Sequence, residues 1–70
     1  MSRGRAAGLL GWIAFQEGAA VDGESLLRAA IVEEPGHWRH HYRLGRLLQA
    51  APKGKAEGQR CLLTAARLAP

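Results

Sequence analysis

The stretch His41-Tyr-Arg-Leu-Gly-Arg-Leu-Leu48 predicts a helix with one small residue set into an apolar face. Its three leucines follow at i, i+3 and i+4, so they share one side of a helix. Gly45 lies between them, although glycine inside a helix costs about 1 kcal/mol relative to alanine. A glycine at such a position indicates that another backbone crosses close by. A second Leu-Gly pair, Leu10-Gly11, precedes this one by 34 residues.

Length and composition limit what the rest of the chain can be. Its 70 residues make one small domain, and domains near this size bury only roughly 60% of the surface of the unfolded chain. The single cysteine, Cys61, allows no intramolecular disulfide. The net charge of +4 is scattered along the chain and is compatible with nucleic acid, an acidic partner or an anionic membrane. No apolar run reaches the roughly 20 residues of a membrane span.

The beginning of the chain has one targeting alternative. Arg3 and Arg5 precede the apolar segment Ala6–Phe15, and this order resembles the basic start and apolar core of a signal peptide. Glu17 follows at once, however, and the segment fits the repeat described below. We therefore expect a cytoplasmic protein without a membrane span, with a cleaved signal as the minor alternative.

Hydrophobic periodicity and helix-end signals predict four helices, over about residues 3–16, 23–33, 37–50 and 55–68. Ser2 is the expected N-cap of the first helix, Gly18 its left-handed end, and Asp22 the expected N-cap of the second. The expected inward residues are Leu10, Ile13 and Ala14, then Leu27, Ala30 and Ile31, and finally Cys61, Leu62, Ala65 and Leu68. No segment alternates like a half-buried strand, so the predicted fold class is all-α.

The two halves of the chain form a repeat of about 34–35 residues. Leu10-Gly11 recurs as Leu44-Gly45, and after one extra residue in the turn around Pro52, four more positions match at a shift of 35. These are Gly23, Leu27, Ala30 and Pro35 in the first unit, and Gly58, Leu62, Ala65 and Pro70 in the second. This pattern resembles two consecutive tetratricopeptide repeats, and the resemblance covers nearly the whole chain.

The resemblance implies an α-solenoid of two antiparallel helix hairpins, with repeat one at about residues 4–37 and repeat two at about 38–70. It also implies a protein–protein interaction module or scaffold that binds a peptide or partner protein on its concave helical face. The implied peptide-binding residues are Arg5, Trp12, Phe15, Gln16, Arg39, Tyr42, Arg46 and Gln49. They would form an aromatic floor with basic walls, suited to a peptide with acidic and apolar residues. An alternative for Trp12 and Phe15 is packing against a neighbouring helix or another copy of the chain.

Chemical sites have little support in the sequence. His37, His40 and His41 cluster at the start of the third helix, and His37 and His41 at i, i+4 could contact a metal. No cysteine or carboxylate at helical spacing completes the set, so the cluster fits a solvated helix start, with His41 packed partly under its neighbours. Cys61 has no histidine near it in sequence and fits an apolar packing position. No phosphate loop and no Ser/His/Asp arrangement are visible. We expect a protein that is not an enzyme and has no cofactor.

Two further expectations concern partners. Arg39, Arg43 and Arg46 make the third helix the most basic region, so the competing function is a basic helical nucleic-acid-binding module. Repeats of this kind usually need about three units for stability. We therefore expect a homodimer, docking on a larger partner, or membership of a longer repeat array.

Overall fold

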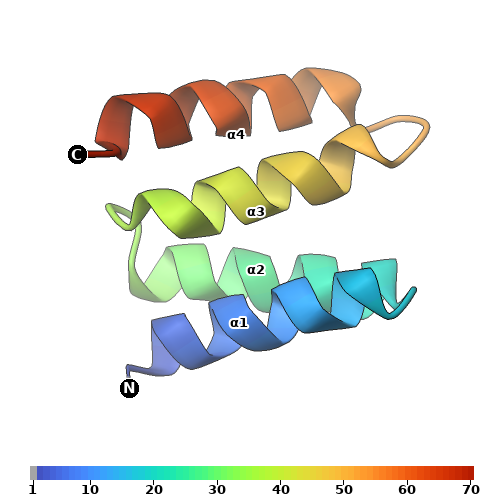
Figure 1. The fold of residues 1–70 in the computed structure, drawn as a ribbon, viewed down its shortest axis with the longest axis horizontal. Coiled ribbons are helices and arrows are strands. Elements are labelled where there is room, and N and C mark those ends of the chain that lie inside the picture. The colour runs from blue at the N-terminus through green and yellow to red at the C-terminus, as the bar shows by residue number, and fades with distance from the viewer. Residues whose placement is uncertain (1) are drawn as a thin grey trace.

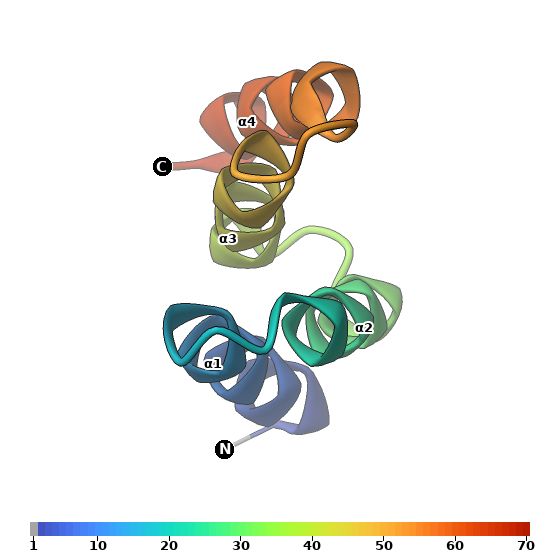
Figure 2. The same ribbon diagram turned by 90° about the vertical axis from the view of Figure 1, so that its right-hand side faces the viewer.

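The computed structural model describes residues 2–70, which form four helices and no strands (Figure 1). Their bounds are α1 (Arg3–Gln16), α2 (Ala20–Glu33), α3 (Trp38–Gln49) and α4 (Lys55–Leu68). Helix α1 packs against α2, and α3 packs against α4, so the chain folds into two successive hairpins. The second hairpin stacks on the first mainly through α2 and α3 (Figure 2). The predicted all-α fold of two antiparallel hairpins is confirmed.

In each hairpin, the two helices cross at a pair of glycines, one from each helix. A Cβ on Gly11 would lie 2.9 Å from the carbonyl oxygen of Gly23, and a Cβ on Gly23 would lie 2.8 Å from that of Gly11. In the second hairpin the corresponding distances are 3.0 Å from Gly45 to Gly58 and 2.9 Å from Gly58 to Gly45. Side chains at these positions would force the helix backbones apart. The sequence shifts of 34 and 35 residues therefore relate positions with the same role in the two hairpins.

The helix ends agree with the sequence except at the start of α2. The Ser2 hydroxyl accepts a hydrogen bond from the Arg5 backbone N–H at 3.0 Å, and Gly18 has a φ of +91°. The prediction that Asp22 caps the second helix is wrong, because α2 begins at Ala20 with Ala19 as its N-cap residue. The tight turn at Gly18 lets the chain enter the helix one turn earlier. Asp22 lies in the first turn of α2, where its negative charge interacts favourably with the positive end of the helix dipole.

The core lies between α2 and α3. Leu27, Leu44, Leu47 and Leu48 form the buried cluster, and three partly buried side chains pack against it: Phe15, Ile31 and Cys61. Ala30 and Ala65 are buried as predicted, whereas Leu68 is exposed. No helix within residues 2–70 combines the length and hydrophobicity that crossing a membrane would need.

The inward face predicted for α1 is wrong. Leu10 and Ile13 are exposed and only Ala14 of the predicted set is half-buried, whereas the fully buried residues of α1 are Gly4, Gly8 and Gly11. Glycines on this face allow α2 and the start of α3 to approach the α1 backbone more closely than leucine side chains would. The apolar stripe of α1 therefore faces outward.

Candidate binding site between α1 and α3

A hollow of about 370 Å³ opens between the first half of α1 and the beginning of α3. Its lining is basic and contains no carboxylate. The lining residues are Arg5, Leu9, His37, Arg39, His40 and Arg43. Arg39 and Arg43 lie one turn apart on α3, which places both side chains on the same side of that helix.

Glu34, just after α2, organises one edge of this hollow. One carboxylate oxygen lies 2.9 Å from His40 Nε2, and the other accepts a hydrogen bond from the Ser2 hydroxyl at 2.9 Å. Arg5 Nε lies 3.8 Å from Glu34 Oε2. The hydrogen bond from His40 is the largest cause that lowers the pKa of Glu34, with smaller contributions from Ser2 and the charge of Arg5. These contacts join α1, the end of α2 and the beginning of α3.

Two glycines of α1 make room for this arrangement. A Cβ on Gly4 would lie 2.7 Å from the Glu34 side chain, and a Cβ on Gly8 would lie 2.5 Å from His40 Nδ1. The imidazole of His40 is only 1% exposed, and its Nδ1 has no hydrogen-bond partner within residues 2–70. A proton on Nε2 is donated to Glu34, whereas a proton on Nδ1 would have no acceptor. The Nε2–H tautomer therefore satisfies the buried ring best.

Positive charge is left over on the α3 side of the hollow. Within the described chain, neither Arg39 nor Arg43 has a carboxylate within ion-pair distance. The Arg39 guanidinium lies 5.1 Å from the centre of the Trp38 ring. Burial, and then the charge of Arg39, lowers the pKa of Arg43, while burial and then His40 lower that of His37. An anion in the hollow would offset this repulsion.

An aromatic pair on α3 neighbours the basic hollow in sequence. The rings of Trp38 and Tyr42 meet edge to face with centroids 6.2 Å apart. Arg46 donates a hydrogen bond to the Tyr42 hydroxyl at 2.7 Å, and its guanidinium lies 5.7 Å from the centre of the same ring. Arg46 therefore has a side-chain hydrogen-bond partner, whereas within residues 2–70 Arg39 has only its contact with the Trp38 ring and Arg43 has neither.

The structure places the residues suggested by the resemblance in separate groups. Arg5 and Arg39 line the same hollow, and Tyr42 pairs with Arg46. Trp12 and Phe15 pair on α1 with ring centroids 5.6 Å apart.

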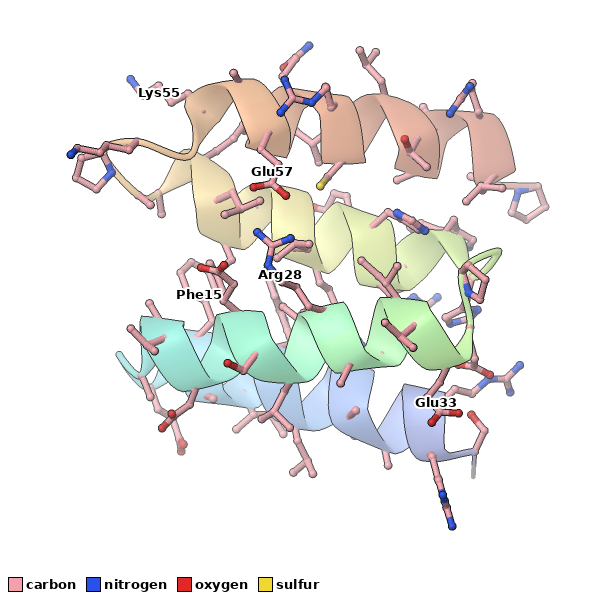
Figure 3. All side chains as sticks on the ribbon, turned by 180° about the vertical axis from the view of Figure 1, so that it is seen from behind. Phe15, Arg28, Glu33, Lys55 and Glu57 are labelled. Atoms are coloured by element: carbon pink, nitrogen blue, oxygen red, sulfur yellow. The ribbon has the colours of Figure 1, made fainter. Side chains whose placement is uncertain are left out.

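The other predicted residues lie away from the hollow. Phe15 packs against the leucine core, and Figure 3 shows its side chain near the α2–α3 junction. Gln16 is exposed at the end of α1. The Gln49 side-chain amide donates a hydrogen bond to Gln59 of α4 at 3.5 Å.

Four lining residues of the hollow are missing from the predicted peptide-binding set: Leu9, His37, His40 and Arg43. The sequence contained a signal for two of them. Arg43 follows Arg39 at i+4, and His40 precedes Leu44 by four residues, so it continues the buried face of α3. The description of the histidine cluster as solvated is wrong for His40. His41 is not among the lining residues of the hollow, and its Nε2 lies 2.7 Å from the Pro35 carbonyl oxygen.

No group of three or more histidine, cysteine, aspartate or glutamate side chains within residues 2–70 is arranged to hold a metal ion. Cys61 is half-buried beside the core, and burial raises the pKa of its thiol.

A scan of protein-family models, a search of curated proteins and a search of solved structures each found no match to the chain.

Proposed function

We propose that this protein is an interaction module that binds an acidic segment of a partner protein in the hollow between α1 and α3. The carboxylates of the segment pair with Arg39 and Arg43, and its apolar side chains contact Leu9 and the Trp38–Tyr42 pair. The observation that carries the proposal is the presence of two neighbouring arginines without a carboxylate partner in a concave site.

Electrostatics supports an anionic ligand. Arg43 is partly withdrawn from water and repelled by Arg39, so the charged form is less favourable there than on an open surface. A carboxylate offers two oxygens to the planar guanidinium group and can form paired hydrogen bonds. Binding therefore compensates two charges that the described chain leaves unpaired.

The distribution of basic groups favours a peptide over nucleic acid. A nucleic-acid site needs free cations along a strand of phosphates, often with bases stacked on exposed aromatic rings. Arg28 is paired with Glu24 and Glu57, and Arg46 is bound to Tyr42. On α3, within the described residues, the arginines without a side-chain hydrogen-bond or ion-pair partner are thus Arg39 and Arg43, and they do not form a stripe along the helix.

The resemblance to tetratricopeptide repeats supports the same proposal. The glycine crossings and the two stacked hairpins are the features expected of such repeats. We infer that the chain consists of two units of this kind. Ligands of the family bind along the first helix of each unit, and these helices are α1 and α3 here.

A peptide panel tests this function. Fluorescein-labelled peptides of equal length and apolar content, with increasing numbers of glutamates, are titrated by fluorescence anisotropy. Affinity is expected to rise with glutamate content and to fall at least about tenfold in the Arg39→Ala/Arg43→Ala variant, because each charged hydrogen bond contributes roughly 1.5–3 kcal/mol.

The matched control is Lys53→Ala/Lys55→Ala, which removes the same charge outside the hollow. Figure 3 shows Lys55 pointing away from the helices at the α3–α4 turn. If both double variants weaken binding equally, only the net charge matters and the site is wrong. A labelled single-stranded oligonucleotide that binds more tightly than every peptide would favour the nucleic-acid function.

A further inference from the structure

The two hairpins use equivalent positions differently. Leu44 and Leu47 of α3 are 2% and 3% exposed, because they pack with Leu27 of α2. At the shift of 34 residues, their counterparts in α1 are Leu10 and Ile13, which are 55% and 40% exposed. In the second hairpin, this surface of α3 packs on α2. The equivalent surface of α1 in the first hairpin is not covered by any part of residues 2–70.

This uncovered surface, the first-hairpin face, includes residues from both α1 and α2. Leu10, Ile13 and Leu26 supply its apolar part, and Glu17 and Asp22 line the same shallow hollow. Large apolar groups that remain this exposed in a small protein often mark an interaction surface.

A second uncovered surface, the α4 face, lies at the opposite end of the stack (Figures 1 and 2). Leu63, which is 57% exposed, and Ala66 lie in a hollow with Arg60 and Arg67. At the shift of 35 residues Ala66 is the counterpart of Ile31, which packs against the core at the junction of the hairpins.

The charges of the two faces are opposite. The first-hairpin face carries Glu17 and Asp22, and the α4 face carries Arg60 and Arg67. None of these four forms an ion pair within residues 2–70.

The contact between the two hairpins of one molecule has the same arrangement of charge, with a basic residue on the first hairpin and an acidic residue on the second. Arg28 of the first hairpin pairs with Glu57 of the second at 2.9 Å, as Figure 3 shows from behind. The counterpart of Glu57 on the first-hairpin face is Asp22. An acidic residue therefore occupies this position in both hairpins.

We propose that the α4 face of one copy binds the first-hairpin face of a second copy, so that the stack of hairpins continues from molecule to molecule. Leu10 and Ile13 then enter the same kind of environment as Leu44 and Leu47. Because the two faces differ, the contact is head to tail and each dimer keeps one free face at either end. Association therefore increases with concentration and can extend beyond the dimer.

Two blocking variants and their mixture test this arrangement by sedimentation velocity on the full 70-residue chain. Leu10→Arg puts a positive charge opposite the basic α4 face, and Leu63→Glu puts a negative charge opposite the acidic first-hairpin face. The wild-type chain is expected to self-associate at high concentration, and each variant alone to remain monomeric. An equimolar mixture is expected to form a dimer that grows no further, since each variant retains the face that the other lacks.

Val32→Glu is the matched control, because it places a charge at an exposed apolar position outside both faces. It should associate like the wild type, and circular dichroism should show the same helicity in all four proteins. If a blocking variant loses helicity, Leu10→Ala and Leu63→Ala replace the pair and should weaken association without blocking it. A wild-type chain that stays monomeric at every concentration overturns the proposal. A Leu63→Glu variant that self-associates as well as the wild type also overturns it, since that result requires a contact that does not use the α4 face.

Discussion

His40 Nε2 lies 2.9 Å from Glu34 Oε1, and this contact ties the end of α2 to the first turn of α3. The imidazole fits there because Gly8 of α1 has no side chain. The contact also fixes one wall of the basic hollow, since His40 is one of its lining residues. Packing in this corner thus contributes both to the junction between the hairpins and to the shape of the candidate binding site.

Replacement of Gly8 by alanine should destabilise the protein. The added Cβ would lie 2.5 Å from His40 Nδ1, and a buried ring has little room to move. Overpacking costs about 1–3 kcal/mol, which exceeds the gain of about 1 kcal/mol in helix propensity. Urea denaturation followed by circular dichroism measures the change. Gly36→Ala is the control, because a Cβ there meets nothing within 4 Å, and it should be nearly neutral.

Acidification should lower the free energy of unfolding in two steps. The folded structure lowers the pKa of His37 from 6.5. As the pH falls below 6.5, the unfolded chain therefore takes up a proton at His37 more readily than the folded chain, and this uptake favours unfolding. The pKa of Glu34 is lowered from 4.5, so its stabilising contribution is lost as the pH falls below that value.

Urea denaturation at a series of pH values separates the two steps. His37→Gln should flatten the step just below pH 6.5, and Glu34→Gln should reduce the step below pH 4.5. Some of the lower step should remain in Glu34→Gln, because Arg28 also lowers the pKa of Glu57. If both variants followed the wild-type curve, the assigned contacts would not be the source of the pH dependence.

The ion pair between Arg28 and Glu57 should contribute only modestly to stability. Two nitrogens of the guanidinium group meet the two carboxylate oxygens at 2.9 and 3.0 Å, but both side chains remain well exposed. A double-mutant cycle with alanine at each position should give a coupling of about 0.2–1 kcal/mol that decreases in high salt. A coupling near zero at low salt would show that this pair does not hold the hairpins together.

Cys61 should react slowly with iodoacetamide at neutral pH. Burial raises the pKa of its thiol, and the side chain packs against the leucine core, so little thiolate is present or accessible. The alkylation rate should increase to that of an unstructured peptide when the chain is unfolded in urea. Equal rates in the folded and unfolded states would contradict this description of the residue.

The fold was largely predictable because it depends on local spacing. The Leu44-Gly45 pair and the same pair at Leu10-Gly11 indicated close helix crossings, and the structure shows matching glycine pairs in both hairpins. The helix ranges followed from capping residues and breakers, apart from the early start of α2.

The inward face of α1 could not be predicted by counting apolar residues. The apolar stripe of this helix, Leu10, Ile13 and Ala14, suggested burial, but the glycine face allows a closer approach of α2. Periodicity identifies an amphipathic face without showing whether another part of the same chain covers it. The same ambiguity explains why the basic hollow was only partly predicted. His40 continues the buried leucine face of α3, yet its partner Glu34 could be found only from the path of the chain between α2 and α3.

Nuclear magnetic resonance of the ¹⁵N-labelled chain tests the central claim most directly. Amide shifts are recorded while the most glutamate-rich peptide of the panel is added, with the Arg39→Ala/Arg43→Ala variant as the comparison. We expect the largest shifts at Leu9, Arg39, His40 and Arg43, small shifts at Val32 and Lys55, and loss of the whole pattern in the variant. Shifts that cluster outside the α1–α3 hollow, or that persist unchanged in the variant, would contradict the proposed binding site.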